Sequence, residues 1–290
     1  MTLLCPRATT GTFGLNTKIK NNDSWVDAQP HVKVGGTWQK VKKTYTKTGD
    51  AWKTGYEYEW LYTFADGVHT DVDIDTLAGI DKFHNVRIVI PNTATLVASA
   101  TNTYALKTGS GYSGVLTIQN NGSILGRGGN GGNGGFGYSY NEIANATGGT
   151  SGGIAVHVES DVIIQNNGTI AGGGGGGGGA EGYVHVGTAY GGGGGGGGGH
   201  PYGTGGSGGS TTHSGTNGAA ATLVDAGVGG VGGYDGTVRG GTGGAGGNAG
   251  ADGSIGGEIT GDHSHVIEST RGAGGLTGAT YHNPSSYIIS

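Results

Sequence analysis

Residues 170–202 read IAGGGGGGGGAEGYVHVGTAYGGGGGGGGGHPY, and this stretch decides the fold. It contains eight consecutive glycines at 172–179 and nine at 191–199, separated by an insert that carries Tyr183 and Tyr190. Glycine loses more backbone freedom on folding than any other residue, so an ordered glycine run needs many compensating backbone contacts. The stretch therefore predicts either a flexible linker or a fold built on backbone hydrogen bonds.

The glycine pattern around these runs repeats every three residues. Residues 128–136 read GGNGGNGGF, and residues 240–248 read GGTGGAGGN. A period of three fits neither an α-helix nor a strand, but it fits the polyproline-II type helix, which has no internal hydrogen bonds. Because each N–H and C=O then points sideways, buried segments must pair with their neighbours. We predict a sandwich of roughly eight to ten polyglycine-II rods.

Two other interpretations of the glycine content are less favoured. A flexible linker is the usual meaning of such composition, but a linker needs no strict three-residue register and no aromatic inserts. A collagen triple helix requires abundant proline, and the chain has 5 prolines in 290 residues. An ordered glycine-rich domain is therefore the favoured interpretation.

Glycine and charge divide the chain into two parts. Residues 1–115 contain 11 of the 72 glycines and a net charge of +2, whereas residues 116–290 contain 61 glycines, no lysine and a net charge of −7. We therefore predict a mainly β N-terminal domain over 1–115 and a glycine-rich domain over 116–290, with almost no α-helix. The charge is too mild, and too little concentrated on one face, for nucleic-acid binding.

The sequence also carries signals about location. Cys5 is the single cysteine, which excludes an intrachain disulfide framework. No stretch approaches the roughly 20 apolar residues of a membrane span, so we expect no membrane insertion. The N-terminus lacks the apolar core of a signal peptide. We therefore expect synthesis in the cytoplasm of the producing cell, without a signal peptide.

Residues 18–60 contain a short repeat in which a turn dipeptide precedes a tryptophan. The dipeptides are Asn-Asp, Gly-Gly and Gly-Asp, and the tryptophans are Trp25, Trp38 and Trp52. The flanking segments alternate in polarity, so the repeat predicts a β-meander of hairpins. We expect the tryptophans to form a small core rather than a ligand-binding platform. The neighbouring lysines either solvate the other face or dock on an acidic partner.

A longer repeat leads into the glycine runs. Residues 116–126 read LTIQNNGSILG, and residues 162–172, which start 46 residues later, read VIIQNNGTIAG. Each segment has an Asn-Gly dipeptide between two apolar runs, starting at Asn121 and at Asn167, and this is a strong hairpin signal. We predict two hairpins that seat the rods on the first domain.

No arrangement of residues predicts catalysis. The alternating run from Asp71 to Asp75 would place three carboxylates on one strand face, but it lacks the later ligands of an EF-hand loop, so we expect a solvated face. His263 and His265 offer two metal ligands without a recognisable third. No glycine run is followed by the Gly-Lys-Ser/Thr of a phosphate loop. We expect no enzymatic activity, no metal and no cofactor.

The inserts between the rods are rich in tyrosine, serine, asparagine and histidine, a composition typical of recognition loops. If successive rods alternate in direction, the inserts at 136–147, at 180–190 and within 211–226 lie at one end, whereas the turn at Tyr202 lies at the base. Beyond Gly227 the sequence does not mark where each rod begins and ends, so the count of directions stops there. The residues expected to bind a receptor are Tyr138, Tyr140, Asn141, Tyr183, His185, Tyr190 and His213.

Residues 116–290 resemble the receptor-binding adhesins at the distal tip of the long tail fibres of T-even-like bacteriophages. The resemblance rests on SILGRGGNGG at 123–132, on NGTIAG at 167–172 ahead of a polyglycine run, and on PYG at 201–203 between two glycine stretches. It implies a polyglycine-II sandwich whose distal loops bind an outer-membrane protein of the bacterial host, with lipopolysaccharide as the other candidate receptor.

The same resemblance implies how the protein is attached. The N-terminal domain of such adhesins sits on a trimeric tail-fibre shaft, so we expect residues 1–115 to bind the shaft, with Trp25, Trp38 and Trp52 near that contact. The resemblance itself does not extend over residues 1–115. The implied location is the virion, at the distal end of a tail fibre.

Two further functions are kept as alternatives. An ice-binding protein built on polyglycine-II rods would carry a flat, regular threonine-bearing face, whereas the third positions here vary among asparagine, serine, valine, threonine and alanine. A capsule-degrading tailspike would need long β-helical repeats and a carboxylate cluster, and the sequence indicates neither. We therefore favour a receptor-binding adhesin.

Overall fold

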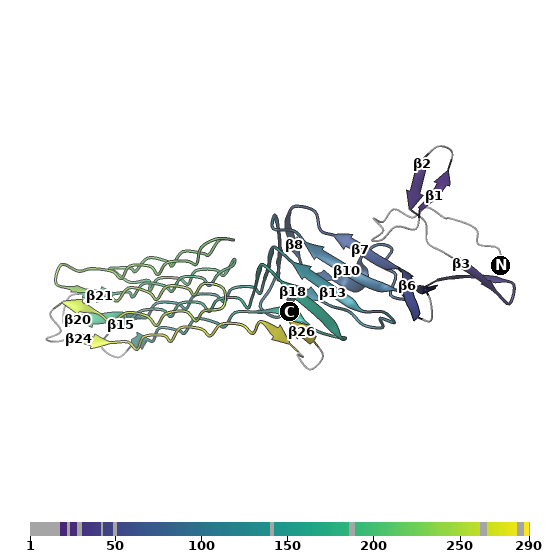
Figure 1. Cartoon of the computed structure of the whole chain (residues 1–290). Helices are drawn as coiled ribbons and strands as arrows, with labels where there is room; N and C mark the ends of the chain where they lie inside the picture. Colours follow the sequence, from purple (N-terminus) through teal and green to yellow (C-terminus); the bar gives the residue numbers. More distant parts are fainter. Residues whose placement is uncertain are drawn as a thin grey trace.

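The computed structural model describes residues 18–21, 24–27, 31–41, 43–48, 51–139, 142–185, 189–261, 266–282 and 287–289. These residues form an elongated molecule with three parts: N-terminal hairpins, a central β unit and a bundle of glycine-rich segments (Figure 1). The described part of the chain contains no α-helix, and its one 3-10 turn, η1, spans Ile74–Thr76. The predicted fold class, mainly β with almost no α-helix, is confirmed.

The central unit is a three-sided coil of parallel strands, which we call the β-helix. Its strands are β7 Glu59–Thr63, β8 Gly67–Thr70, β9 Val72–Asp73, β10 Asn85–Ile90, β11 Ala94–Val97, β12 Tyr104–Lys107, β13 Leu116–Asn120, β14 Ser123–Leu125, β17 Ile154–His157, β18 Val162–Asn166, β19 Thr169–Ala171, β25 Tyr281–His282 and β26 Tyr287–Ile289. They form three sheets, with the orders β26-β18-β13-β10-β7, β19-β14-β11-β8 and β25-β17-β12-β9. Each complete coil therefore contributes one strand to each sheet.

Aliphatic side chains fill the inside of the β-helix because equivalent positions of successive coils align in register. Ile88, Ile118 and Ile164 are register partners in neighbouring strands, and all three are buried. Burying one such side chain contributes about 1.5–3 kcal/mol, so these stacks are a main source of stability in this part. The other two stacks contain Leu96 with Ile124 and Leu106 with Val156.

Asparagines extend the same stacking to a corner of the β-helix. Asn120 donates through Nδ2 to Oδ1 of Asn166 at 2.7 Å, and Asn167 donates through Nδ2 to Oδ1 of Asn121 at 3.2 Å. The 46-residue repeat in the sequence is therefore one coil stacked on the next, with identical polar residues in register.

The two predicted Asn-Gly hairpins are wrong. β13 pairs with β10 and β18, while β14 pairs with β11 and β19, so the dipeptide bends the chain from one sheet into the next. Glycine is needed because the coils approach closely: a Cβ on Gly168 would lie 2.1 Å from the carbonyl oxygen of Gly122. A glycine at such a corner and a glycine in a hairpin turn produce the same local sequence signal.

The predicted domain boundary after residue 115 falls inside the β-helix. Leu116 begins β13, which lies between β10 and β18 in one sheet. The glycine-rich segments 126–153 and 172–280 are two insertions, since the chain returns from them to β17 and to β25. Composition changes where the insertions begin, whereas sheet pairing joins segments on both sides of that change.

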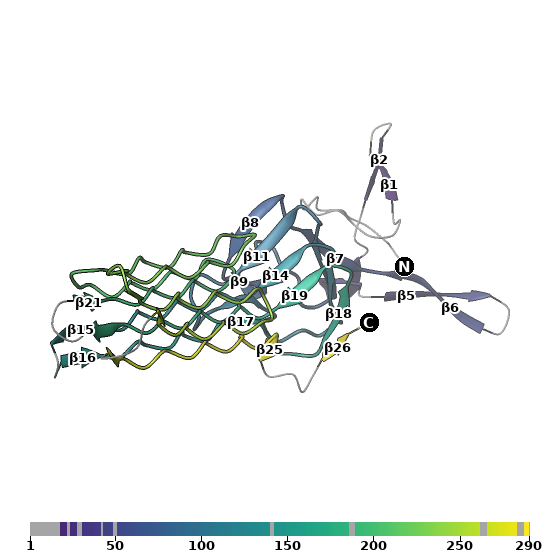
Figure 2. The ribbon, with the colours of Figure 1, turned by 90° about the vertical axis from the view of Figure 1, so that its left-hand side faces the viewer.

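Three two-stranded antiparallel hairpins precede the β-helix (Figures 1 and 2). The predicted hairpins are confirmed, but within the described residues they form three separate sheets rather than one meander. Trp38 is 45% exposed, so the expectation that it belongs to a small core is wrong. The side chains of Trp25 and Trp52 lie outside the described part of the structure. The hairpins pair β1 Lys18–Asn21 with β2 Ser24–Asp27, β3 His31–Val34 with β4 Thr37–Lys40, and β5 Lys43–Thr48 with β6 Ala51–Glu57.

The two insertions form extended segments that run side by side, which we call rods (Figure 2). Their backbone N–H groups donate to carbonyl oxygens of neighbouring rods at distances of 2.6–3.2 Å. In the described residues there are ten: rod 1 (126–135), rod 2 (145–153), rod 3 (172–182), rod 4 (191–200), rod 5 (203–210), rod 6 (214–222), rod 7 (226–234), rod 8 (239–248), rod 9 (251–259) and rod 10 (269–280).

Rod 3 shows the three-residue period directly. The N–H of Gly173 donates to rod 2, that of Gly174 to rod 4 and that of Gly175 to rod 9, and each series continues in steps of three residues. This pattern agrees with the predicted period and differs from a strand, whose groups alternate between two sides. The polyglycine-II conformation itself stays a prediction.

Rods 3 and 4 contain the two uninterrupted glycine runs, and they lie at the centre of the bundle. Rod 3 is hydrogen-bonded to rods 1, 2, 4, 8, 9 and 10, and rod 4 to rods 1, 3, 5, 6, 7 and 8. No edge is left for a side chain. A Cβ on Gly176 would lie 1.9 Å from the carbonyl oxygen of Asn130, and one on Gly195 would lie 2.1 Å from that of Gly206. The outer rods keep one edge toward solvent, and this edge takes the third residue of each GGX repeat, as Val228 and Val231 show.

Candidate functional site

The inserts between the rods gather at the end of the bundle farthest from the N-terminal hairpins (Figure 1). Rod 3 runs antiparallel to rods 2 and 4 and parallel to rods 1 and 9, as the order of its hydrogen-bond partners shows. Odd-numbered rods thus lead away from the β-helix and even-numbered rods return to it. The predicted alternation is confirmed, and it continues past Gly227. We call the far end the tip; its described segments are 136–139, 142–144, 183–185, 189–191, 211–213, 234–239, 260–261 and 266–268.

Short antiparallel strands replace the rods at the tip. β15 (Phe136–Ser139) pairs with β16 (Glu142–Ala144), and β22 (Val238–Arg239) pairs with β23 (Thr260–Gly261). β20 (Tyr183–His185) lies between β21 (Ala189–Gly191) and β24 (Val266–Glu268). Because β20 and β24 come from different inserts, this sheet joins segments that are distant in the sequence into one surface.

Tyr183 belongs to the core of the tip and not to its surface. The side chain is fully buried with Val238 and Ile259, and its hydroxyl donates to the carbonyl oxygen of Val238 at 2.8 Å. Burial, with the nearby Asp235 carboxylate, raises the pKa of the Tyr183 phenol above its usual value. The prediction that Tyr183 contacts a receptor is therefore wrong. Composition alone does not separate a tyrosine that anchors the scaffold from one that faces solvent.

Two of the predicted contact residues lie side by side at the tip. Tyr190 in β21 and His213 are both half-buried, and the Tyr190 carbonyl oxygen accepts from the His213 N–H at 3.1 Å. The same carbonyl accepts from the Thr211 hydroxyl at 2.9 Å. These bonds connect the insert after rod 3 to the insert after rod 5, so the two inserts present one continuous surface.

Of the other four predicted contact residues, two belong to strands at the tip. Tyr138 belongs to β15 and His185 to β20, and only their backbone is described. Tyr140 and Asn141 lie outside the described residues. Their role in binding, like that of Tyr190 and His213, stays a prediction.

The turn at 234–239 adds residues that were not among the predicted contacts. Tyr234 is 50% exposed, and its hydroxyl donates to the carbonyl oxygen of Gly236 at 2.7 Å. The guanidinium of Arg239 lies 5.0 Å from the Tyr234 ring centroid. Asp235 accepts hydrogen bonds from two backbone N–H groups of this turn at 2.8 Å, which hold it in place. Continuing the GGX register through rod 7 would have placed this turn at the tip.

Carboxylates cluster beside the tip. Glu181 accepts from the N–H of Ile259 at 3.1 Å, and its burial, together with the charges of Glu268 and Glu258, raises the pKa of its carboxyl. Arg271 pairs with Glu258 at 2.6 Å. This flank of the tip is therefore acidic, with one arginine that partly neutralises it.

Tyr202 lies at the opposite, base end of the bundle, as predicted. Its N–H donates to the carbonyl oxygen of Thr222 at 3.3 Å, and the guanidinium of Arg127 lies 5.3 Å from its ring centroid. Its φ of 61° is uncommon for a residue other than glycine. These contacts join the base turns of rods 1, 4 and 6.

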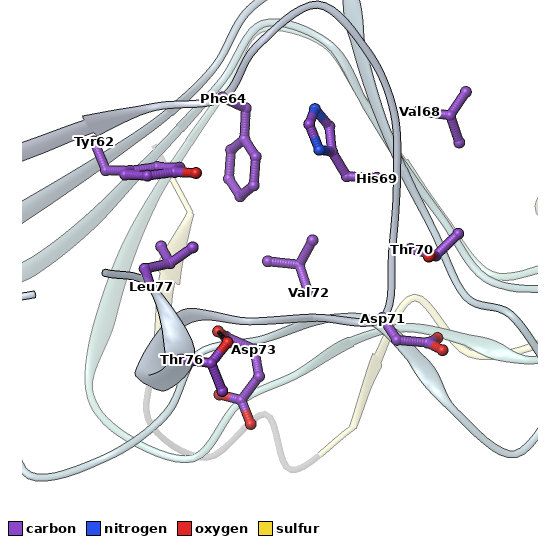
Figure 3. Close-up of a pocket in the computed structure, with 10 residues that line it drawn as sticks. All are labelled: Tyr62, Phe64, Val68, His69, Thr70, Asp71, Val72, Asp73, Thr76 and Leu77. Atoms are coloured by element: carbon purple, nitrogen blue, oxygen red, sulfur yellow. Dashed lines mark hydrogen bonds between the residues drawn. The ribbon is translucent and has the colours of Figure 1, made fainter. Parts of the chain in front are cut away.

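A recess of about 450 Å³ opens at the first coil of the β-helix (Figure 3). Its lining includes Tyr62, His69 and Val72, which begin the three stacks that run through the β-helix. The recess is therefore the open end of the β-helix core.

Asp71, beside this recess, is used within the fold. It accepts from the N–H of Ser99 and from the hydroxyl of Thr103, both at 2.8 Å. Burial opposes ionisation of Asp71, yet these hydrogen bonds hold its pKa below the usual value. The carboxylate therefore ties the β8–β9 corner to the β11–β12 corner of the next coil.

Asp73 and Asp75 are likewise paired. Asp73 lies 3.1 Å from Lys107 and caps η1, and Asp75 lies 2.6 Å from Lys82. The predicted row of carboxylates on one strand face is wrong, because only Val72–Asp73 is extended and the chain then enters η1.

The described residues offer no metal centre of three or more histidine, cysteine, aspartate or glutamate side chains. His263 and His265 lie outside them. The sequence was expected to lack β-helical repeats, and this absence weighed against a tailspike. That expectation is wrong, because the central unit is a β-helix. The three carboxylates near its open end are nevertheless each tied to a neighbouring side chain.

A search of the described residues for a helix long and apolar enough to cross a membrane finds none.

Comparison with known proteins gives a family match. A family model described as phage tail fibre adhesin Gp38 matches residues 65–290. Among solved structures, the chain is similar to the crystal structure of the gp37-gp38 adhesin tip complex of the bacteriophage S16 long tail fiber. The identity is 26%, the TM-score is 0.43, and the similarity covers 81% of this chain and 83% of that chain. No curated protein sequence matches the chain.

Proposed function

This chain belongs to the phage tail fibre adhesin Gp38 family, and we propose that its tip binds a protein of the bacterial outer membrane. The family match includes all ten rods and nearly all of the β-helix. The protein is accordingly a tail-fibre adhesin that acts in host recognition.

The observation that carries the proposal is the convergence of the inserts on one end of a hydrogen-bonded bundle. Successive pairs of rods each present their insert at the tip, and hydrogen bonds such as that between Tyr190 and His213 join neighbouring inserts. A platform that already holds its loops in place loses little entropy on binding. The bundle thus provides a preorganised recognition surface.

The chemistry of the tip favours a protein receptor over lipopolysaccharide. Tyrosine and arginine dominate binding energy in protein interfaces, and the tip exposes Tyr234 and Arg239 and half-exposes Tyr190. Exposed Thr212 and Thr237 add adaptable hydrogen-bonding groups. This combination resembles the recognition loops of antibodies, which bind protein surfaces.

The opposite end of the molecule attaches the adhesin to a tail-fibre shaft, which the resemblance implies to be trimeric. The N-terminal hairpins and the β-helix lie away from the tip (Figure 1), so attachment there leaves the recognition surface free. In this proposal the tip lies at the distal end of the fibre. An adhesin acts by binding, and we assign no catalytic role to it.

The outer faces of the rods disfavour the ice-binding alternative. The solvent edge of rod 7 carries Val228, Val231 and Tyr234 at its third positions. A flat, regular array of threonines is not formed along this rod.

A host-adsorption competition assay tests the proposal. Purified protein should block adsorption of the phage that carries this adhesin, and Tyr234→Ala should block it less well. Val228→Ala, a matched change on the side of rod 7, should block as well as the wild type. Host cells lacking single outer-membrane proteins, compared with cells with truncated lipopolysaccharide, separate the two receptor classes. Folded protein that never competes would contradict the proposal.

A further inference from the structure

The two broad flanks of the bundle are each centred on one outer rod. Rod 1 is hydrogen-bonded to rods 2, 3, 4 and 5, and rod 8 is hydrogen-bonded to rods 3, 4, 7 and 9. The two rods therefore occupy equivalent places on opposite flanks. Residues 128–133 of rod 1 read GGNGGN, and residues 240–245 of rod 8 read GGTGGA, so only the third positions differ.

Side chains close the flank of rod 1. The N–H of Asn130 donates to the hydroxyl oxygen of Thr150, and the N–H of Asn133 donates to that of Thr147, both at 2.7 Å. The Oδ1 atoms of the same two asparagines accept from N–H groups of rod 5 at 2.9–3.1 Å. At both third positions the outward N–H group is therefore already bonded within the protein.

The flank of rod 8 has no such caps. Within the described residues, no acceptor receives the N–H of Thr242 or that of Ala245, and both residues are exposed. Gly257 of rod 9 lies beside the first of them, since a Cβ on Gly257 would be 3.1 Å from the Thr242 nitrogen. Without that Cβ, the amide stays uncovered. The two free donors are three residues apart, which is about 9 Å along a segment with this period.

Uncharged, partly apolar side chains border this row of donors. The hydrogen-bond register between rods 7 and 8 places Val231 next to Thr242 and Val228 next to Ala245. The two valines are 44% and 67% exposed, and the same edge of rod 7 reaches the tip at Tyr234. Contiguous exposed apolar side chains commonly mark an interaction site. This flank is therefore a continuation of the tip surface along the side of the bundle.

Free backbone donors beside apolar side chains are also what an edge strand presents, and extended peptides bind such edges through backbone hydrogen bonds. In a strand, the outward groups repeat every two residues. Here they repeat every three, so the matching partner is a chain in a polyproline-II type conformation, whose carbonyl groups have the same period.

We propose that an extended, uncharged loop segment of the outer-membrane receptor lies along rod 8. Its carbonyl oxygens accept from the N–H groups of Thr242 and Ala245, and its apolar side chains contact Val231. This inference rests on the proposed function, because it extends the binding surface of the tip onto one flank. Charge supports an uncharged segment: between Arg239 and the base, the third positions of rods 7 and 8 carry no charged residue.

Hydrogen exchange of the wild-type protein tests this inference without any substitution. The protein is mixed with outer-membrane vesicles from the host strain or from a strain that the phage does not adsorb to. Host vesicles should slow exchange of the Thr242 and Ala245 amides by at least about tenfold, because free amides become hydrogen-bonded. The capped amides of Asn130 and Asn133 should not change.

The exchange pattern also separates the flank from the tip. Protection of the tip inserts without protection of Thr242 and Ala245 would overturn the flank inference and leave the tip proposal standing. Host vesicles that protect neither region would contradict both. Equal protection of the flank by vesicles from both strains would mean that it binds a component other than the receptor, which would also overturn the inference.

Two proline variants provide a matched comparison in the host-adsorption competition assay. Ala245→Pro removes one of the free donors, and Ala220→Pro removes an equally unbonded N–H from an exposed residue of rod 6. Proline is tolerated where the N–H is not used, and it favours the polyproline-II conformation, so both variants should melt like the wild type. Ala245→Pro should compete about three- to tenfold less well, as expected for one lost hydrogen bond. Ala220→Pro should compete as well as the wild type.

Folded Ala245→Pro that competes fully would overturn the inference, and if this variant does not fold, the exchange measurement on the wild type decides. Val228→Ala keeps every backbone group of the flank and therefore stays neutral. Sedimentation of the protein alone tests a second copy as the occupant. Dimers that protect the Thr242 and Ala245 amides in the absence of vesicles would assign the flank to self-association and overturn the inference.

Discussion

The β-helix and the rod bundle are stabilised by opposite uses of the side chain. In the β-helix, buried side chains such as Ile118 and Leu96 fill the interior, and the backbone pairs only along the sheets. In the bundle, the central rods 3 and 4 have no side chains along their glycine runs, and their backbones pair with six other rods each. The comparison shows that a buried core does not require apolar side chains. In the central rods, close packing comes from backbones that lack Cβ and hydrogen-bond on all sides. In the β-helix, it comes from buried aliphatic side chains.

A change at the centre of the bundle should have the largest effect. Gly176→Val should destabilise the protein by more than about 4 kcal/mol, because the added Cβ meets the carbonyl oxygen of Asn130 and no edge of rod 3 is free. Thr242→Val, at a solvent-facing third position of rod 8, should change stability by less than about 0.5 kcal/mol. Thermal unfolding followed by circular dichroism measures both. Equal melting of the two variants would mean that the glycine runs are loose linkers.

A change inside the β-helix should cost less, because side chains around a cavity relax in part. Ile118→Ala should destabilise the protein by about 2–5 kcal/mol. Val115→Ala, at a 48% exposed position next to the same strand, should have an effect of less than about 0.5 kcal/mol. Denaturant unfolding gives both values. If the two variants lose the same stability, the stacked interior is not what holds this part together.

Changes at the two ends of the bundle should separate binding from stability. Tyr190→Ala and Tyr234→Ala should each weaken receptor binding by about 2 kcal/mol, with an unchanged melting temperature. Tyr202→Ala should lower the melting temperature and leave adsorption by the folded fraction unchanged. Tyr183→Ala should impair both, because it empties the core of the tip. Adsorption assays and thermal melts on the same samples measure binding and stability separately. If Tyr202→Ala lost adsorption but kept its stability, the assignment of the receptor-binding surface to the tip would be contradicted.

The joint between the two regions contains a histidine pair. His157 in β17 and His282 in β25 are register partners where rods 2 and 10 return to the β-helix, and their Nδ1 atoms are 2.8 Å apart. One nitrogen must donate and the other accept, so the bond is lost when both rings are protonated. Burial, together with His282 and Lys107, holds the pKa of His157 below its usual value, although Glu159 acts in the opposite direction.

This pair should make the junction between the rods and the β-helix sensitive to acid. Of the four predicted effects, we expect this one to be the smallest. Because the pKa of His157 is lower in the folded state, the unfolded state binds more protons, and stability falls as the pH decreases below about 6.5. Between pH 7 and pH 5 the melting temperature of the wild type should therefore fall by about 2–4 °C more than that of His157→Gln. His213→Gln, at the tip, is the matched control and should follow the wild type. A parallel pH profile for His157→Gln would show that the pair does not contribute.

The sequence predicted the rods and their directions better than it predicted the β-helix. Glycine every third residue is a local signal, and counting rods from Gly126 placed the first three inserts correctly at the tip. The β-helix escaped prediction because its stacks join residues in different coils, such as Ile118 and Ile164, and because its corner glycines look like hairpin turns. At the candidate site, the inserts were identified but the exposure of individual residues was not. Tyr183 proved to be buried and Tyr234 exposed, since each depends on what packs against it.

The sequence by itself determined that this protein contains a bundle of glycine-rich segments with a three-residue period, because a residue without Cβ is required wherever backbones pair on every edge. It also determined which rods lie at the centre, because only the uninterrupted glycine runs at 172–179 and 191–199 can be surrounded by other rods on all sides. Tertiary structure alone decided that the bundle is inserted between the coils of a β-helix and that inserts distant in the sequence share one surface. Those features depend on hydrogen bonds and packing between segments that are far apart along the chain, and no local pattern of residues specifies them.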